Sequence, residues 1–429
     1  MAEGSSWRGR WAAVGLALAL GLSICAPASG QTYAPLDQPG PPLSVPLPKL
    51  RASLQCEASV RNAKEEPVLL NPATGVTPTQ NFGWNWEPAL DMLGIPWCAY
   101  TAPHSTLGDI QTSGEHLVYA IRTEHALAQR RIAILGHSQG GMSMRWALRF
   151  WPDTRAMVED VIGIDGTNHG TTQQAPGCAG IGCPPADWQQ GADSAFIHAL
   201  NSRAETVPGI SYTEIYTRRD EVATPDYDAA HCTSCLHTGR GAITNVATQQ
   251  LCPGDLNEHN TAGTIDPIAY ALGVDALTHP GPADPGRVPK SVCSQLLMPG
   301  VTSPQAAAAA LQEFEGLPGV LSVAITPLAP ILTGVQNVKA EPPLDCYVFA
   351  ACAGASAPTL RLSFTRRHHR IRALVRTLEG SRLVPVPGAT VKLHGHRTRT
   401  GARGLATLPA GHGRLVARRA GCNPASRTV

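Results

Sequence analysis

Blocks of apolar and polar positions along residues 66–277 predict strands and helices that follow one another in turn. Short apolar runs, each typical of a buried strand, occupy residues 68–70, 95–100, 132–135, 161–164 and 212–216. Longer stretches with apolar residues at helical spacing lie at 89–93, 109–127, 140–150 and 265–277. This order predicts an α/β fold, with a mostly parallel central sheet covered by helices on both faces.

The pattern changes at about residue 355. Apolar and polar residues then alternate one by one, and Gly and Pro residues separate the segments 360–364, 371–375, 389–393 and 414–416. The alternation predicts a small antiparallel, β-sandwich-like domain over residues 355–429.

Charge divides the chain at the same point. Residues 355–429 contain 15 Lys and Arg and one acid, Glu379, which gives +14, whereas residues 1–354 contain 19 basic and 31 acidic side chains, which gives −12. Two interpretations stay open: a domain of Arg-rich composition without a ligand, or a module that binds an anionic cell envelope or another polyanion. The net charge of +2 for the whole chain gives no case for nucleic acid binding.

The N-terminus has the layout of a secretion signal. Arg8 and Arg10 precede an apolar run over residues 11–26, and small residues continue to Gly30. The run is short for a bilayer span, which needs about 20 residues, so we predict a signal peptide over residues 1–30. A Pro-rich arm over 31–50 follows. The protein is therefore expected to be secreted or associated with the cell envelope; the sequence does not indicate its oligomeric state.

Twelve cysteines are present, and removal of Cys25 with the signal peptide leaves eleven. An exported protein meets an oxidising compartment, so most of them are expected to pair. Cys232 and Cys235 have His231 and His237 beside them, which suggests either a zinc site or a local disulfide. Because no second CxxC lies at zinc-ribbon spacing, we favour the disulfide and predict no metal.

The sequence Gly136-His137-Ser138-Gln139-Gly140 is the motif that points to chemistry. A buried strand leads into it and a helix leaves it, as a nucleophile elbow requires. Glycines flank the serine because a Cβ atom there would collide with the neighbouring strand and helix. The turn exposes the serine oxygen at a helix N-terminus, which favours developing negative charge. The alternative is an ordinary Gly-Ser turn.

A serine nucleophile needs a base and an acid that orients the base. In this kind of fold they follow the serine in the order acid, then histidine. Asp220 comes just after the strand at 212–216, and we favour it over Asp165, which follows the strand at 161–164. His259, in a loop before the helix at 265–277, is the candidate base.

A series of motifs in order resembles one known family. The segments lie at 71–75, 85–86, 138–141, 188–190, 217–225 and 252–259. Together they make roughly residues 50–350 similar to the Candida antarctica lipase B-like α/β-hydrolases, including their secreted bacterial members. The resemblance implies an α/β-hydrolase domain over residues 51–354. It also implies a secreted serine lipase or esterase that cleaves carboxylic esters, such as acylglycerols, through an acyl-enzyme without a cofactor.

The resemblance also assigns roles to individual residues. It implies Ser138 as nucleophile, His259 as base and Asp220 as acid. It implies an oxyanion hole formed by Thr74 and Gln139. Family members place pocket-lining residues at Thr167, Gln190 and Val222, and disulfides at Cys56–Cys98 and Cys252–Cys293.

Three features depart from the family. His137 stands where the yeast lipase has a tryptophan at the floor of its alcohol pocket. The loops at Cys178–Cys183 and Cys232–Cys235 are additions, and residues 355–429 loosely resemble carboxypeptidase-regulatory or Ig-like modules. Two other functions stay open: an acyltransferase that builds envelope lipids with the same triad, and a non-catalytic binding protein on a hydrolase scaffold.

Overall fold

The computed structural model describes residues 32–173, 178, 182–305, 334–352, 360–379, 382–419 and 425–429. The predicted signal peptide lies outside the described residues. Among the described helices, none has the length and apolar character needed to cross a bilayer.

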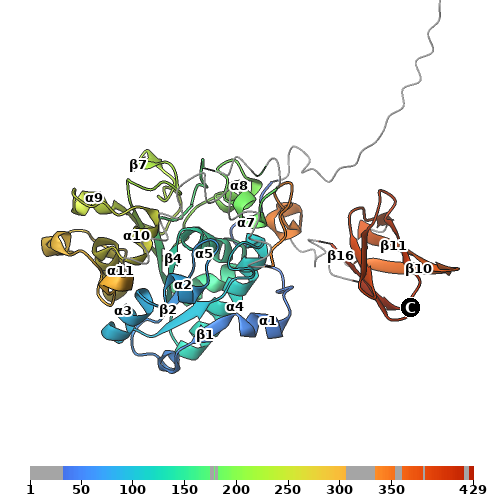
Figure 1. Ribbon diagram of the computed structural model, residues 1–429, viewed down its shortest axis with the longest axis horizontal. Helices are drawn as coiled ribbons and strands as arrows, with labels where there is room; N and C mark the ends of the chain where they lie inside the picture. The colour runs from blue at the N-terminus through green and yellow to red at the C-terminus, as the bar shows by residue number, and fades with distance from the viewer. Residues whose placement is uncertain are drawn as a thin grey trace, which may run out of the picture.

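A seven-stranded sheet forms the centre of the larger body (Figure 1). Its strands, in spatial order, are β1 (Leu54–Cys56), β3 (Trp97–Tyr100), β2 (Val68–Asn71), β4 (Ile132–His137), β5 (Val158–Ile164), β6 (Ser211–Tyr216) and β9 (Ala242–Ala247). All neighbours pair in parallel except β1, which runs antiparallel to β3 at one edge. The predicted mostly parallel α/β sheet is confirmed. The two strands that the pattern did not predict, β1 and β9, are the edge strands.

Each central strand sends alternate side chains into two different cores, because successive residues of a strand face opposite sides of the sheet. In β4, Ile132 and Ile134 belong to one buried cluster, and Ala133 and Leu135 belong to the other. Burial on both faces explains why the strands are continuous apolar runs in the sequence.

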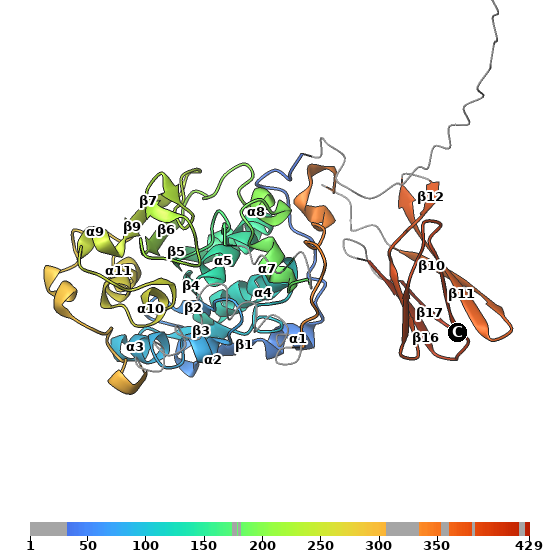
Figure 2. The same cartoon turned by 45° about the horizontal axis from the view of Figure 1, so that its top comes forward.

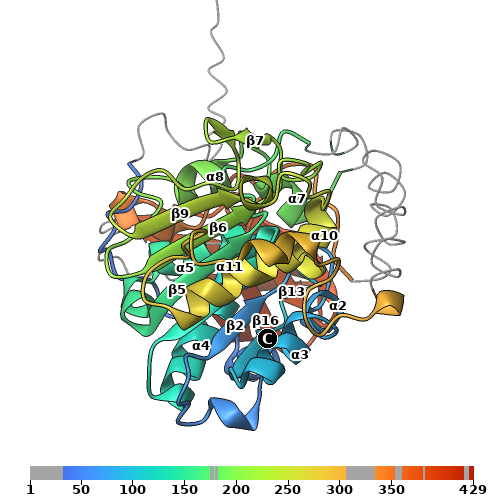
Figure 3. The same cartoon turned by 90° about the vertical axis from the view of Figure 1, so that its left-hand side faces the viewer.

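Helices cover both faces as predicted. On one side lie α4 (Ile110–Ala128) and α5 (Gln139–Phe150), and on the other lie α3 (Trp86–Leu93) and α11 (Pro267–Thr278). Figure 3 shows α11 crossing its face of the strands. Shorter helices are α1 (Leu47–Ala52), α2 (Pro78–Asn81), α7 (Pro185–Gln189), α8 (Ala195–Leu200), α9 (Thr248–Leu251) and α10 (His259–Thr264).

The Pro-rich arm packs against the larger body along its described length. The Nη2 atom of Arg149 donates to the carbonyl of Ala34 at 2.6 Å, and the indole N–H of Trp151 donates to Pro41 at 2.9 Å. Glu115 accepts from the backbone N–H of Val45 at 2.9 Å. These contacts tie the arm to α4, α5 and the residue that follows α5.

Disulfides join Cys56 to Cys98, Cys178 to Cys183, Cys232 to Cys235 and Cys252 to Cys293. The first links the edge strand β1 to β3, and the last links the region after α9 to the segment beyond α11. The Cys232–Cys235 bond is the local disulfide that the sequence favoured over a zinc site.

The C-terminal residues form two antiparallel sheets with a buried core between them (Figures 1 and 2). One sheet contains β10 (Arg361–Arg367), β11 (Arg370–Glu379), β12 (Arg382–Pro385) and β15 (Leu405–Pro409). The other contains β13 (Thr390–Leu393), β14 (His396–Arg399), β16 (Arg414–Arg418) and β17 (Ala425–Thr428). The predicted sandwich-like architecture is confirmed. A small two-stranded ribbon, β7 (Asp226–Asp228) with β8 (His231–Cys232), completes the strands.

The start of α4 generates a prediction about stability. Asp109 caps this helix by accepting the Gln111 N–H at 3.0 Å, and it also accepts from Nε2 of Gln189 at 2.7 Å. Replacing it with alanine removes both bonds, so Asp109→Ala should lower the free energy of unfolding by about 1–2 kcal/mol, measured by urea unfolding. Asp109→Asn keeps an acceptor oxygen and is the control. Equal losses in the two variants would contradict a capping role.

Candidate active site

Ser138 sits at the sharp turn between β4 and α5, as the motif predicted. Its φ of 56° is in the left-handed region, and its N–H donates to the Ile164 carbonyl at 2.9 Å. A Cβ atom on Gly136 would lie 2.4 Å from the backbone of Gly140, and one on Gly140 would lie 2.0 Å from the Asn71 oxygen. The turn therefore requires glycine at both positions.

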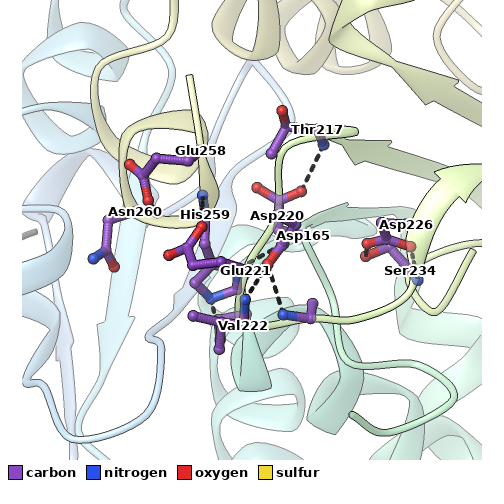
Figure 4. A network of polar contacts seen from close by, with 12 residues as sticks. Asp165, Thr217, Asp220, Glu221, Val222, Asp226, Ser234, Glu258, His259 and Asn260 are labelled. Atoms are coloured by element: carbon purple, nitrogen blue, oxygen red, sulfur yellow. Dashed lines mark hydrogen bonds and ion pairs between the residues drawn. The ribbon is translucent and has the colours of Figure 1, made fainter. Parts of the chain in front are cut away.

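Three side chains from separate parts of the chain meet at this turn. The Oγ of Ser138 lies 2.9 Å from Nε2 of His259, and Nδ1 of His259 lies 2.7 Å from Oδ2 of Asp220. All three side chains are buried, and Figure 4 shows His259 with the carboxylates around it. Asp220 follows β6, and His259 is the first residue of α10 rather than part of a loop before the helix. The arrangement is that of a nucleophile, a base and an orienting acid.

Asp220 has hydrogen-bond partners on both of its carboxylate oxygens. Its Oδ1 atom accepts the backbone N–H groups of Val222 at 2.7 Å and Ala223 at 2.6 Å, while its Oδ2 atom faces His259. Hydrogen bonds from donors stabilise the charged form of a carboxylate. The carboxylate is therefore satisfied on both oxygens.

Asp165, the rival acid from the sequence, lies close by in a different state. Its Oδ1 accepts the Thr217 N–H at 2.8 Å, but its buried Oδ2 has no hydrogen-bond partner among the described residues. A carboxylate oxygen of Asp165 lies within 4.8 Å of ligand atoms of Asp220 and His259. Burial, and then the charge of Asp220, raise the pKa of Asp165 well above its usual value. Asp165 therefore resists ionisation, and it does not contact the imidazole of His259 by a hydrogen bond as Asp220 does.

These three residues also form the one group of potential metal ligands found among the described residues. Both ring nitrogens of His259 already face partners, Ser138 on one side and Asp220 on the other. The geometry thus suits proton transfer along this line.

Carboxylates around His259 adjust its basicity. Burial alone would lower the pKa of its imidazole, but the nearby charges of Asp220, and then of Glu221 and Glu258, raise that pKa above the ordinary 6.5. The Glu221 carboxyl itself has its pKa raised to about 7 by burial and by Glu258. His259 is therefore a stronger base than a free imidazole.

Thr74 lies across from the elbow, on the loop after β2. Its hydroxyl oxygen accepts from Nε2 of Gln139 and from Nε2 of Gln190, both at 3.1 Å. Thr167 in turn donates to Oε1 of Gln190 at 3.1 Å. With both amides donating to its oxygen, the Thr74 hydroxyl has its proton available for another acceptor. The N–H of Gln139 belongs to the first turn of α5, where backbone donors have no intrahelical partner.

The remaining predicted pocket residue, Val222, is placed differently. It lies two residues after Asp220, and 37% of it is exposed, so it is at the outer edge of the buried triad. Thr167 and Gln190 are both buried. Gln190 contacts Thr74 directly, and Thr167 contacts Gln190. The structure brings all of the predicted site residues to this one region.

Two supporting residues were not predicted. Thr106 accepts the Gly75 N–H at 2.8 Å and donates to the Ala73 carbonyl at 2.7 Å, so it braces the Thr74 loop. Asn71 donates to the Gly140 carbonyl at 2.8 Å and so connects the end of β2 to α5. A buried polar residue at the end of an apolar strand was the signal available for Asn71; Thr106 lies in a loop with no such signal.

Comparisons with known proteins place these features in context. The family described as Lipase (class 2) matches residues 116–264. Lipase B of Pseudozyma antarctica, also called Candida antarctica, is 31% identical over 240 residues, which are 55% of this chain and 69% of that protein. The crystal structure of Aspergillus fumigatus lipase B superposes with a TM-score of 0.61 at 29% identity, covering 75% of this chain and 76% of that one.

The charges around His259 generate a prediction about pH. The imidazole must be neutral to accept the Ser138 proton, so the rate of Ser138 labelling by a fluorophosphonate should fall as pH drops through the raised pKa of His259. We expect the half-maximal rate above pH 6.5, the ordinary value. Glu221, with a pKa of about 7, is partly charged in this range, so Glu221→Gln should move the midpoint to lower pH by less than the loss of a full charge would.

The matched control is Glu65→Gln, because Glu65 is exposed and precedes β2 at the end of the sheet opposite the site. This variant should leave the midpoint unchanged. A midpoint below 6.5 in the parent, or the same shift in both variants, would contradict the electrostatic account.

Proposed function

The chain belongs to the lipase B family of carboxylic ester hydrolases, and we propose that it cleaves its ester substrates through an acyl-enzyme formed on Ser138. The observation that carries the proposal is the continuous line from Asp220 through His259 to Ser138, with distances of 2.7 and 2.9 Å. An acyl-enzyme divides hydrolysis into two steps that each need the same base.

In the proposed first step, His259 removes the proton of Ser138 as Oγ attacks the ester carbonyl carbon. The carbonyl oxygen gains negative charge and is stabilised by the N–H of Gln139 and by the backbone and hydroxyl of Thr74. One such donor typically contributes about 3–4 kcal/mol to the transition state. Asp220 stabilises the imidazolium that forms.

To complete this step, His259 gives its proton to the leaving alcohol, and the carbon–oxygen bond to that alcohol breaks to leave the acyl-enzyme. In the second step, water enters, loses a proton to His259 and attacks the acyl-enzyme carbonyl. Collapse releases the carboxylic acid and returns the proton to Ser138. Thr167 and Gln190 hold the Thr74 oxygen throughout, so its hydroxyl proton stays directed at the carbonyl oxygen.

We further propose that the protein is exported. The four disulfides support this assignment, because such bonds persist in oxidising compartments. The charged and apolar N-terminal segment supports it as well.

The C-terminal sheets supply a second part of the proposal, a surface that binds a polyanion. On the outer face of the first sheet, Arg361 pairs across strands with Arg376, and Arg367 pairs with Arg370. Like charges directly opposite one another destabilise a sheet. Within the described residues, no ion pair neutralises them.

The other sheet also carries basic side chains on its surface. Lys392 pairs with Arg397, and Arg418 lies across from Thr390, all with the charged side chains exposed. A shallow hollow of about 750 Å³ opens beside the first sheet, lined by Thr365, Arg367, His368, His369, Arg370, Arg372 and Thr407. An anionic chain bound there would relieve the repulsion between the arginines.

Replacement of the serine tests the proposed chemistry. Ser138→Ala should abolish turnover of a p-nitrophenyl ester, while the parent should show a rapid burst of p-nitrophenol before steady turnover. Circular dichroism and thermal unfolding check that the variant is folded. Undiminished turnover in the variant, or phosphonate labelling at a different residue, would reject Ser138 as the nucleophile.

Removal of residues 355–429 tests the second part. The shortened chain should keep its turnover of a short soluble ester, because the buried cores of the two parts share no residue. It should elute from heparin at lower salt than the full chain. In the full chain, Arg367→Gln combined with Arg370→Gln should lower the elution salt, whereas Arg61→Gln on the larger body should not. Unchanged elution after truncation would refute the binding surface.

A further inference from the structure

A chain of hydrogen bonds runs behind the triad through His137, the residue before the nucleophile. His137 is the last residue of β4, and Asn81 is the last residue of α2. Their exposed fractions are 2% and 4%. The backbone N–H of Ala73 donates to Oδ1 of Asn81 at 2.8 Å. The Nδ2 atom of Asn81 lies 3.3 Å from Nδ1 of His137, and Nε2 of His137 lies 3.0 Å from the carbonyl oxygen of His259.

The chemistry of these groups fixes where each proton lies. A carbonyl oxygen only accepts, so Nε2 of His137 must carry a hydrogen and donate to His259. The Ala73 N–H needs an oxygen, so the Asn81 amide must present Oδ1 to Ala73 and its NH2 group to His137. Nδ1 of His137 is then the acceptor. All three bonds are satisfied by one arrangement, with a neutral imidazole in the Nε2–H form.

The surroundings hold the ring in this state. Burial, and then the nearby His259, lower the pKa of His137 to about 3, so the imidazole is neutral over the pH range in which a serine hydrolase works. The ring lies 5.2 Å from the ring of His259. A Cβ atom on Gly263 would approach the His137 ring to 2.3 Å, so α10 packs closely on it.

We propose that His137 and Asn81 are positioning residues that fix three catalytic segments relative to one another. This hydrogen-bond chain connects the loop that carries Thr74, the strand that leads into Ser138 and the helix that begins at His259. This inference rests on the proposed function, because it assigns a task to residues behind the triad. Neither residue touches the substrate in this account; each acts through the atoms that it holds.

Close positioning of this kind affects the chemical step more than binding. A displacement of about 1 Å at reacting groups can cost about 100-fold in rate. Loss of these hydrogen bonds should therefore lower kcat and leave KM nearly unchanged, as expected when an interaction that orients the transition state is removed.

Two variants of His137 each retain one of its two hydrogen bonds. In His137→Gln, the side-chain amide nitrogen takes the place of Nε2 and can still donate to the His259 carbonyl. In His137→Asn, the amide oxygen takes the place of Nδ1 and can still accept from Asn81, but the bond to His259 is lost. His137→Leu loses both bonds.

For p-nitrophenyl ester turnover we expect His137→Gln to stay within about threefold of the parent kcat. His137→Asn and His137→Leu should fall by about 10- to 100-fold at nearly constant KM. Asn81→Leu should fall likewise, because it also loses the bond from the Ala73 N–H that holds the Thr74 loop. The double variant with His137→Leu should lose no more than the worse single variant, because residues that act as one unit are not additive. Equal kcat in the Gln and Asn variants would overturn the proposal, and so would additive losses.

His116→Gln and His116→Asn serve as matched controls. His116 is another buried histidine, within α4; its Nδ1 lies 2.8 Å from Oγ of Ser53, and burial lowers its pKa to about 4. These changes should alter stability without altering kcat. If His137→Leu does not fold, the Gln and Asn variants decide the question.

A spectroscopic measurement tests the hydrogen bonds of His137 without relying on enzymatic activity. In the full-length protein labelled with ¹⁵N-histidine, the His137 ring should give the chemical shifts of the neutral Nε2–H form at pH 7, and Asn81→Leu should perturb its Nδ1 shift. An Nδ1–H or charged ring would overturn the proposal. If the parent protein lacks esterase activity, the proposed function fails, whereas the ring state still decides whether the hydrogen-bond chain exists.

Discussion

The hydrogen bond between Nε2 of His259 and Oγ of Ser138 is the contact on which the rest of the molecule's chemistry depends. It joins residues 121 positions apart in the chain. The parallel sheet makes it possible, because the carboxyl ends of β4 and β6 lie at the same edge and their following loops converge there. Ser138 follows one strand, Asp220 follows another, and α10 delivers the imidazole between them. Small errors in any of these segments would separate the two atoms.

Hydrogen bonding then distinguishes the two buried acids near the imidazole. Asp165 and Asp220 both lie at the carboxyl ends of adjacent strands, and two buried carboxylates this close cannot both carry charge at low cost. The two carboxylates differ in the backbone N–H donors that they receive. Asp220 receives two backbone N–H groups and faces His259, while Asp165 receives one N–H and leaves an oxygen without a partner. Asp220 is therefore the acid that faces the imidazole and has partners on both oxygens.

Much of this arrangement could be predicted from the sequence because the signals are local. Apolar runs marked the buried strands, and the Gly136-to-Gly140 motif marked the elbow through steric requirements that the structure reproduces. Strand β9 was missed because its edge position leaves polar residues such as Thr244 and Asn245 only partly buried, so no apolar run forms. The preference for Asp220 over Asp165 followed from order along the chain. Only the structure shows which donors each of the two carboxylates receives.

Contacts between distant polar atoms were beyond prediction for a physical reason. Nothing in the spacing of Asn81 and His137 indicates that their side chains meet, since they lie 56 positions apart and neither belongs to a periodic pattern. The same holds for the bonds of Gln190 and Thr74 across 116 positions. Such bonds exist because buried polar groups must find partners wherever the packed elements place them. The strands and the elbow of the site are therefore encoded by local sequence, whereas its polar network is specified only by the packed fold. That network determines how accurately the catalytic side chains are positioned.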